Sequence, residues 1–276
     1  MEPVGSDPSG SKSDASLQLQ IYLRYGKINL MDFVKKGEKK MKERIYSIPL
    51  TEALEQDCDC IMCSVAKTME DNNIDYFLGP SMMEPECRMI TNNRGFCPDH
   101  LSKLYERGNR LSLALMLDTH LEEVRGRLKK RAKLFKATGF GSGGARKSVD
   151  KLVDELDKIV ESCAVCDKLD REIEAAAENL VYLWDKERDF REKFSRSKGL
   201  CLPHMKMVVK ASAEELTGKN LDEFIRELML LENARLDELN EDIHWFTQKY
   251  DYRNQDAPWG NAKDALPRAV KRLGGE

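Results

Sequence analysis

Cysteine and histidine residues occur in two short motifs, and each motif occurs twice. A Cys-x-x-Cys motif is followed by a Gly-x-Cys-x-x-His motif, and the spacing between them differs by one residue between the two copies. Thiolate sulfur and imidazole nitrogen are the ligands that zinc prefers, and four of them complete a tetrahedral shell. The sequence therefore predicts two zinc sites, each with three cysteines and one histidine. The eight predicted ligands are Cys60, Cys63, Cys97, His100, Cys163, Cys166, Cys201 and His204.

The residues around these ligands favour the same chemistry. Gly95 permits an unusual backbone angle just before Cys97. Pro98 suits the first turn of a helix, where a backbone N–H is not needed. Cys97 and His100 then share one face of that helix, because residues three apart are neighbours on its surface. Gly199 has the same place in the second copy.

The pairing of the motifs is open at this stage. Each quartet can close within its own repeat, which is the simpler arrangement, or the two halves can exchange ligands. Three thiolates and one imidazole fill the zinc shell, which is typical of a structural site rather than a catalytic one. A redox dithiol and an iron–sulfur cluster are the alternatives, but the redox motif belongs to a strand-containing context that this sequence lacks.

Two cysteines and two histidines stand outside the motifs. Cys58 precedes the first motif and has no cysteine counterpart in the second copy, and Cys87 has no partner there either. His120 and His244 lie in segments with helical periodicity. We interpret all four as packing or surface residues rather than ligands.

Hydrophobic residues recur with the helical period of 3.6 rather than the strand period of 2. Residues 111–135 form a strong predicted helix. A second apolar row continues at Val149, Leu152, Val153, Leu156, Ile159 and Val160. No pair of segments has the pattern of a hairpin, so the predicted fold is all-α.

The repeated motifs predict a duplicated architecture. Two pseudo-repeated helical units, each with a predicted Cys3His zinc site, are joined by a glycine-rich linker and followed by a C-terminal helical extension. The predicted boundaries are 41–136 for the first unit, 137–147 for the linker, 148–250 for the second unit with its long helix, and 251–276 for a C-terminal strap and short helix.

The first forty residues differ from the rest in composition. Residues 1–16 are rich in Ser, Gly, Asp and Pro, which predicts disorder. The phrase "KGEKKM", residues 36–41, is what a translated ribosome-binding site gives. We therefore expect that residues 1–40 are a leader upstream of a true start at Met41; a genuine flexible tail is the alternative.

Composition limits the classes of function. The net charge of −3 does not suggest a protein that coats nucleic acid along its whole surface. The sequence contains no apolar run long enough to predict a membrane span, and the N-terminus lacks the features of a signal peptide. A cytoplasmic location follows, where cysteines stay reduced.

Two surface segments are candidates for binding. Residues 125–147 contain Lys and Arg but no Asp or Glu, a pattern that suits phosphate backbones. The residues of this possible anion or nucleic-acid patch are Arg125, Arg127, Lys129, Lys130, Arg131, Lys133 and Lys136. Tyr252, Arg253 and Trp259 are residue types favoured at protein interfaces, although a tail that straps down its own helices is the preferred interpretation.

Several separated phrases match one known family in order. "IYSIPLTEALEQDCDCIMC", "DYFLGPSMMEPECR", "GFCPDHLSKL", "SKGLCLPHM" and "WFTQKYDYRNQDAPWGNAKDALPRAV" resemble the DUF6062 family of uncharacterised bacterial proteins, across about residues 41–274. The resemblance implies a start at Met41. It implies no activity and no catalytic residues.

The sequence favours a protein that is not an enzyme, because no catalytic motif emerges. We expect a zinc-stabilised helical module that binds another protein or acts in regulation, with two structural Zn²⁺ ions and no membrane partner. One alternative is a nucleic-acid binder that uses residues 125–147. The other is a thiol/zinc redox sensor, in which oxidation of the thiolates releases the metal.

Overall fold

The protein is described by a computed structural model that covers residues 46–137 and 142–275. All regular structure in these residues is helical, as predicted. None of the described helices combines the length and the apolar composition that a membrane span needs. The leader 1–40, Met41 and residues 138–141 of the expected linker lie outside the described residues.

The elements are α3 (Ser47–Glu55), α4 (Ile61–Leu78), η1 (Pro80–Met83), α5 (Pro85–Arg94), α6 (Pro98–Glu106), α7 (Arg110–Ala137), α8 (Ser142–Val160), α9 (Ala164–Lys186), α10 (Arg188–Arg196), α11 (Leu202–Glu215), α12 (Gly218–Gln248), η2 (Tyr252–Asn254), η3 (Gly260–Asp264) and α13 (Ala265–Gly274).

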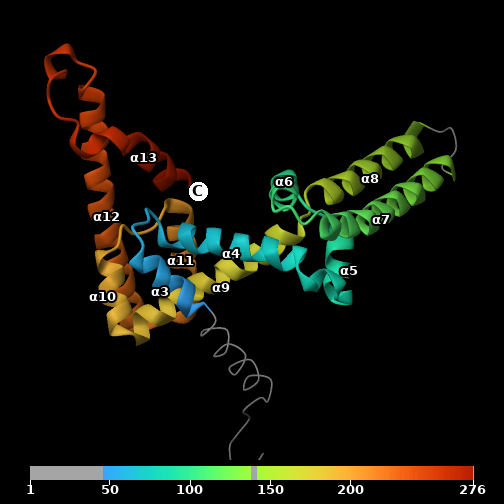
Figure 1. Ribbon diagram of the computed structural model, residues 1–276, viewed down its shortest axis with the longest axis horizontal. Helices are drawn as coiled ribbons and strands as arrows, with labels where there is room; N and C mark the ends of the chain where they lie inside the picture. The colour runs from blue at the N-terminus through green and yellow to red at the C-terminus, as the bar shows by residue number, and fades with distance from the viewer. Residues whose placement is uncertain (1–45, 138–141, 276) are drawn as a thin grey trace, which may run out of the picture. The chain divides into compact units, whose positions relative to one another are not determined.

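Helices α4 and α9 pack along each other in opposite directions (Figure 1). The amide of Asn73 on α4 donates a hydrogen bond of 2.6 Å to the carboxylate of Glu172 on α9. Further along α4, the ring of Tyr76 lies 5.4 Å from the ammonium of Lys168, which is earlier on α9. Because the later residue of one helix contacts the earlier residue of the other, the pair is antiparallel.

Two hydrophobic clusters form around opposite ends of this pair. The first takes residues from the start of α4 and the end of α9, together with α3, α10, α11 and α12. The second takes residues from the end of α4 and the start of α9, together with α5, α6 and α7. Each cluster thus contains the N-terminus of one central helix, and those N-termini carry the Cys-x-x-Cys motifs.

Helices α7 and α8 lie side by side as a hairpin (Figure 1). Helix α7 confirms the prediction for residues 111–135. Helix α8 begins at Ser142, inside the segment 137–147 that was expected to be a linker, so the glycines there do not prevent helix formation. The predicted apolar row on α8 is helical, but much of it faces outward: Val153 is 48% exposed and Val160 is 66% exposed.

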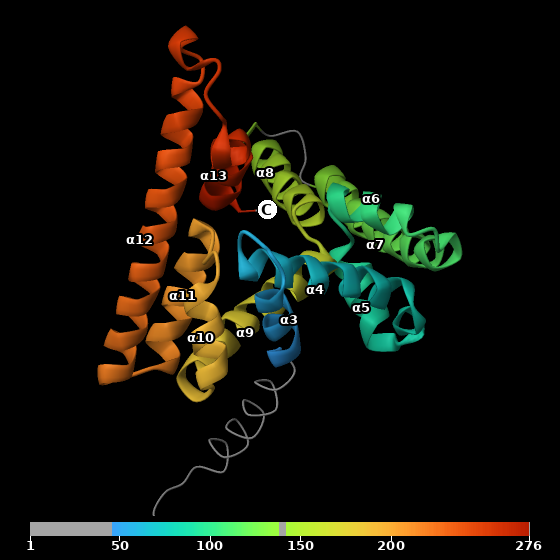
Figure 2. The same cartoon turned by 60° about the vertical axis from the view of Figure 1, so that its left-hand side comes forward.

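The C-terminal segment folds back on the end of α12, and α13 lies beside α12 (Figure 2). The ring of Trp259 is centred 5.7 Å from that of Phe246 on α12. The buried ammonium of Lys249 donates to backbone carbonyls of the segment, at Asn254, Gln255 and Ala257. These contacts are those of a strap that holds the protein's own helices.

Candidate metal centres

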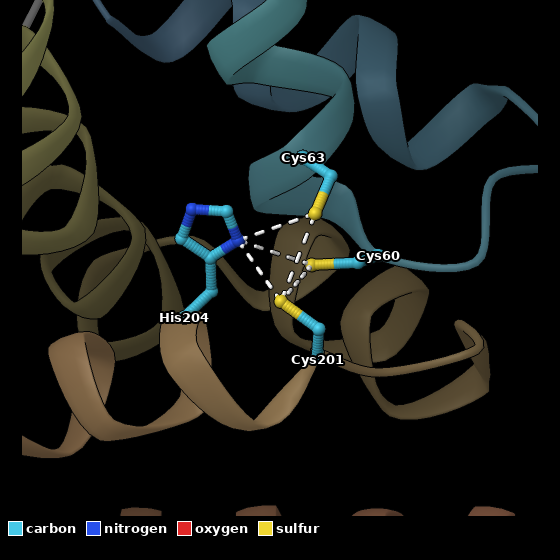
Figure 3. Close-up of side chains that lie close together, drawn as sticks. All are labelled: Cys60, Cys63, Cys201 and His204. Carbon is cyan, nitrogen blue, oxygen red and sulfur yellow. Dashed lines mark hydrogen bonds between the residues drawn. The ribbon is translucent and has the colours of Figure 1, made fainter. Parts of the chain in front are cut away.

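The first group of ligands lies between the starts of α4 and α11 (Figure 3). Cys60 precedes α4 and Cys63 lies in its first turn, while Cys201 precedes α11 and His204 lies in its first turn. The Sγ atoms of Cys60 and Cys201 are 3.7 Å apart. Nδ1 of His204 lies 3.3 Å from Sγ of Cys63 and 3.1 Å from Sγ of Cys201. All four donor atoms lie within 4.8 Å of one another.

The second group lies between the starts of α6 and α9. Cys97 precedes α6 and His100 lies in its first turn, while Cys163 and Cys166 occupy the start of α9. Nδ1 of His100 is 3.1 Å from Sγ of Cys97 and 3.3 Å from Sγ of both Cys163 and Cys166. The Sγ atoms of Cys97 and Cys166 are 3.9 Å apart. The structure therefore brings all eight predicted ligands into two Cys3His groups.

The expectation that each quartet closes within its own repeat is wrong. Each group combines the Cys-x-x-Cys of one half with the Cys-x-x-His of the other. The reason is the length of α4: Cys63 lies in its first turn, and at 1.5 Å rise per residue the rest of the helix to Leu78 carries the chain about 22 Å away from Cys63 before Cys97 is reached. Antiparallel packing of α9 on α4 brings Cys163 to that far end, so the ligands are exchanged between the halves.

The donor distances fit a tetrahedral metal. Bond lengths of about 2.3 Å to sulfur and 2.0 Å to nitrogen imply tetrahedron edges of about 3.8 Å between sulfurs and about 3.5 Å between sulfur and nitrogen. The separations between sulfurs are 3.7 and 3.9 Å, and those from sulfur to nitrogen run from 3.1 to 3.6 Å. A disulfide needs sulfurs about 2.05 Å apart, and every cysteine is a free thiol. The residues present fit a zinc ion in each group.

The electrostatics of both groups favour a cation at their centre. Burial raises the pKa of the Cys166 thiol, and the neighbouring Cys163 and Cys97 raise it further. In the other group, burial lowers the pKa of His204, but hydrogen bonds to the surrounding cysteines outweigh this effect and raise it to about 12. Closely packed thiolates repel one another, and a divalent metal among them would supply the positive charge that offsets this repulsion.

Two glycines shape the turns that carry the ligands, as the sequence predicted. Gly95 has φ +61° and Gly199 has φ +81°, a region that side chains disfavour. A Cβ added to Gly95 would lie 2.4 Å from Nε2 of His120, and one added to Gly199 would lie 2.5 Å from Oε1 of Glu232. Both turns are thus backed by a polar side chain from a later helix. His120 lies outside both Cys3His groups, and sequence reasoning missed its place against the turn and missed Glu232 altogether.

A carboxylate supports the histidine of the second group. Nε2 of His100 lies 3.0 Å from Oε1 of Glu70, and the ammonium of Lys103 holds the same carboxylate at 2.6 Å. Burial raises the pKa of Glu70, but Lys103 and His100 outweigh it and hold that pKa below its usual value. An ionised carboxylate accepts a hydrogen bond from the N–H at Nε2 of the imidazole. This leaves the lone pair of Nδ1 free to bind a metal. No motif marked Glu70 in the sequence.

Buried charges support the turn before Cys201. The backbone N–H of Leu200 donates 2.7 Å to Oε1 of Glu232. The guanidinium of Arg272, on α13, donates 2.6 Å to the carbonyl of Leu200, and it also donates to the carbonyl of Lys198. Arg272 and Glu232 form a buried ion pair at 3.4 Å. The C-terminal helix therefore holds the loop that presents Cys201.

The remaining cysteines and histidines lie outside both groups. The thiol of Cys58 donates to the carbonyl of Ala53 at 3.4 Å. Cys87 is buried in the second hydrophobic cluster, and burial raises its pKa. His244 contacts Gln248 at 2.9 Å.

The predicted basic patch lies on α7 but is not a uniform surface. Arg127 and Arg131 both pair with the buried carboxylate of Glu155 on α8, at 2.5 and 2.7 Å. The exposed members are Arg125, Lys129, Lys130 and Lys133. Lys136 lies near the end of the same helix.

The C-terminal candidates are divided between surface and strap. Tyr252 is 79% exposed. Arg253 pairs with Asp251 at 2.6 Å. Trp259 packs on α12, with the ammonium of Lys249 5.2 Å from its ring.

Comparison with known proteins decides the family. The model of a family described as being of unknown function, DUF6062, matches residues 41–276. The chain belongs to the DUF6062 family. No curated protein and no solved structure matches it. For this DUF6062 protein, the geometry of its two Cys3His groups is therefore the strongest guide to what it does.

Proposed function

We propose that this DUF6062 protein is a zinc-stabilised helical scaffold that binds other proteins, and that its two zinc ions join its halves. One observation carries the proposal: each Cys3His group takes two donors from each half of the chain. A metal in either group ties the start of one central helix to a helix of the other half. Metal-binding energy then becomes folding energy.

The filled donor sets support a structural role for the metal. Four protein donors complete a tetrahedral shell, whereas a catalytic zinc keeps a position for water. Cys60 and Cys63 are each 5% exposed and Cys201 is 1% exposed, so this group is screened from solvent. Three thiolates disfavour magnesium and calcium, which prefer oxygen ligands. Zinc is the metal that suits these donors and this geometry best.

The thiol ligands also bear on location and partners. Thiolates persist in reducing compartments, so we place the protein in the cytoplasm. Exposed large apolar side chains lie on α5 and α13, and exposed Tyr252 lies in the C-terminal segment. Surfaces of this kind support contact with other proteins. The nucleic-acid alternative has less support, because two of its arginines are already paired with Glu155.

A redox role is the second candidate, and the exposure of the second group favours it. Cys97 and Cys166 are both partly exposed, and their sulfurs are 3.9 Å apart. A peroxide can take two electrons from these two thiolates, which then form a disulfide, while the O–O bond breaks and two protons are taken up to give two waters from hydrogen peroxide, or one water and one alcohol from an organic peroxide. Loss of two ligands releases the metal. Zinc release from the second group before the first, reversed by a thiol reductant, is the result that this role predicts.

Elemental analysis tests the proposal. Protein purified from cytoplasm under reducing conditions should contain two zinc ions per chain, one for each group. Affinity capture from the native host, with the zinc-loaded chain as bait and the chelator-treated chain as control, tests the binding of other proteins. Purified protein without metal, or with iron in place of zinc, contradicts the zinc proposal. Equal capture by the metal-free chain contradicts the role of the folded scaffold.

A further inference from the structure

The α7–α8 hairpin carries a continuous apolar face, which we call the hairpin face. On α8 it consists of exposed residues spaced by three and four: Val149, Val153, Leu156 and Val160. On α7 a shallow hollow is lined by Leu121, Val124, Leu128 and Ala132, with Arg125 and Lys129 at its border. Apolar surface of this extent outside the core is typical of an interaction site.

The two rows lie on the same side of the hairpin. The helices contact each other through Arg127 and Arg131 on α7 and Glu155 on α8. At 3.6 residues per turn, the apolar row is displaced from this contact by about a quarter of a turn on α7 and by somewhat more than a third of a turn on α8, in the same rotational sense on both helices. Because the helices of a hairpin run in opposite directions, rotations in the same sense away from the contact lead to the same side. The rows therefore form one surface.

The two outer edges of the hairpin face carry opposite net charges. Beyond the apolar row, the outer edge of α7 presents the exposed cations Arg125, Lys129 and Lys133, and nearer the start of the helix the exposed anions Asp118 and Glu122. The corresponding edge of α8 presents the exposed anions Asp150, Asp154 and Asp157, followed by Glu161 just after the helix, with the exposed cation Arg146 near its start. Among the described residues, no ion pair within the chain engages these edge charges. They are thus available to a partner with the reverse arrangement.

We propose that the partner is a second copy of this chain, and that two hairpin faces pack into an antiparallel four-helix bundle. A two-fold axis parallel to the helices places α7 of one copy against α8 of the other. The basic edge of each copy then meets the acidic edge of its partner, and both apolar rows are buried. A two-fold axis across the helices would place α7 against α7, with like charges opposed, and is disfavoured.

This inference goes beyond the zinc proposal and does not depend on the identity of the metal. Helix α8 packs chiefly on α7. Its side chains therefore contribute little to the hydrophobic core outside the α7–α8 hairpin. The helical spacing of the apolar row on α8 predicts that this row is buried, and the dimer would bury it. Loss of the dimer should leave both Cys3His groups intact.

Sedimentation or light scattering of the full-length, zinc-loaded chain at micromolar concentration tests the contact. The wild type should be a dimer. The double variant Val153→Glu with Leu156→Glu should raise the dimer dissociation constant more than about 100-fold, because it places carboxylates in the apolar centre. Leu230→Glu, at an exposed leucine of α12, is the matched control and should remain a dimer. Unchanged helicity and zinc content in each variant separate loss of contact from loss of folding.

Charge reversal tests the orientation. Lys129→Glu with Lys133→Glu makes the α7 edge acidic like that of α8, and Asp154→Lys with Asp157→Lys removes the net negative charge of the α8 edge. Each variant alone should dimerise more weakly than the wild type, and an equimolar mixture should form a heterodimer. The weakening should shrink as salt rises.

Three results would overturn the proposal. One is a wild-type chain that is monomeric at these concentrations. Another is a dimer that survives the Val153 and Leu156 substitutions, since its interface then lies elsewhere. The third is a dimer that the charge reversals do not weaken, which contradicts the pairing of α7 with α8.

Discussion

Cys63 and His204 are separated by 141 positions in the sequence, yet Sγ of Cys63 lies 3.3 Å from Nδ1 of His204. In the other group, Cys163 and His100 are separated by 63 positions, and the corresponding distance is 3.3 Å. A metal bound by either pair closes a long loop of chain. Each bound ion therefore lowers the conformational entropy of the unfolded chain and also stabilises the folded chain.

Removal of metal should unfold most of the protein. Structural zinc contributes on the order of 10–16 kcal/mol to the folding of small zinc modules, which is comparable to the entire stability of a typical domain, about 5–15 kcal/mol. Circular dichroism during titration with a strong chelator should show loss of helical signal, and added zinc should restore it. Retention of full helicity in protein proven to be metal-free contradicts a structural role.

Loss of the carboxylate behind His100 should weaken only the second group. Glu70→Gln removes the anion that orients the imidazole, and such support is worth about 10–100-fold in metal affinity. Competition with a chromophoric chelator should show one of two zinc ions released more easily. Asp71→Asn is the matched control, because Asp71 is the next residue on α4 and pairs with Arg107 instead. Equal weakening by both substitutions would argue against the assigned role of Glu70.

The turn before Cys201 should not tolerate a side chain. Gly199→Ala forces an alanine to φ +81° and brings its Cβ against Glu232, so we expect a loss of at least about 1–3 kcal/mol in the free energy of unfolding. Gly126→Ala is the control: this glycine lies inside α7 with open space around it, and alanine should stabilise the helix by about 0.5–1 kcal/mol. Urea unfolding of the zinc-loaded variants measures both. A Gly199 variant as stable as the wild type would show that the turn can relax.

The buried guanidinium of Arg272 should matter more than the half-buried guanidinium of Arg268. Arg272→Met leaves Glu232 without its buried partner, and such losses cost about 3–5 kcal/mol. Arg268→Met, on the same helix, removes a half-buried pair with Asp242 and a more exposed pair with Asp264 and should cost less, about 1 kcal/mol. Thermal unfolding at saturating zinc separates the two. Similar losses in both variants would mean that α13 acts by general packing alone.

The sequence predicted the ligands because their chemistry is local. A glycine with positive φ, a proline in the first helical turn and donors three residues apart are all properties of short segments. The same locality explains the correct prediction of α7 and of the helical row on α8 from their apolar periodicity.

The pairing of ligands was not predictable in the same way. It depends on α4 and α9 packing in opposite directions, which long-range contacts such as that of Asn73 with Glu172 determine. Glu70, Glu232 and Arg272 were missed for the same reason, since each reaches a ligand-bearing turn from a distant helix. The row at Val153 shows a further limit, because periodicity identifies an apolar face without saying what covers it.

Zinc content of two double variants tests the exchange of ligands between the halves most directly. Cys60→Ser with Cys201→Ser removes two ligands of one group, and Cys60→Ser with Cys97→Ser removes one ligand from each. We predict one zinc ion per chain in the first variant and none bound tightly in the second. The reverse result, none in the first and one in the second, would mean that each quartet closes within its own half and would contradict the account.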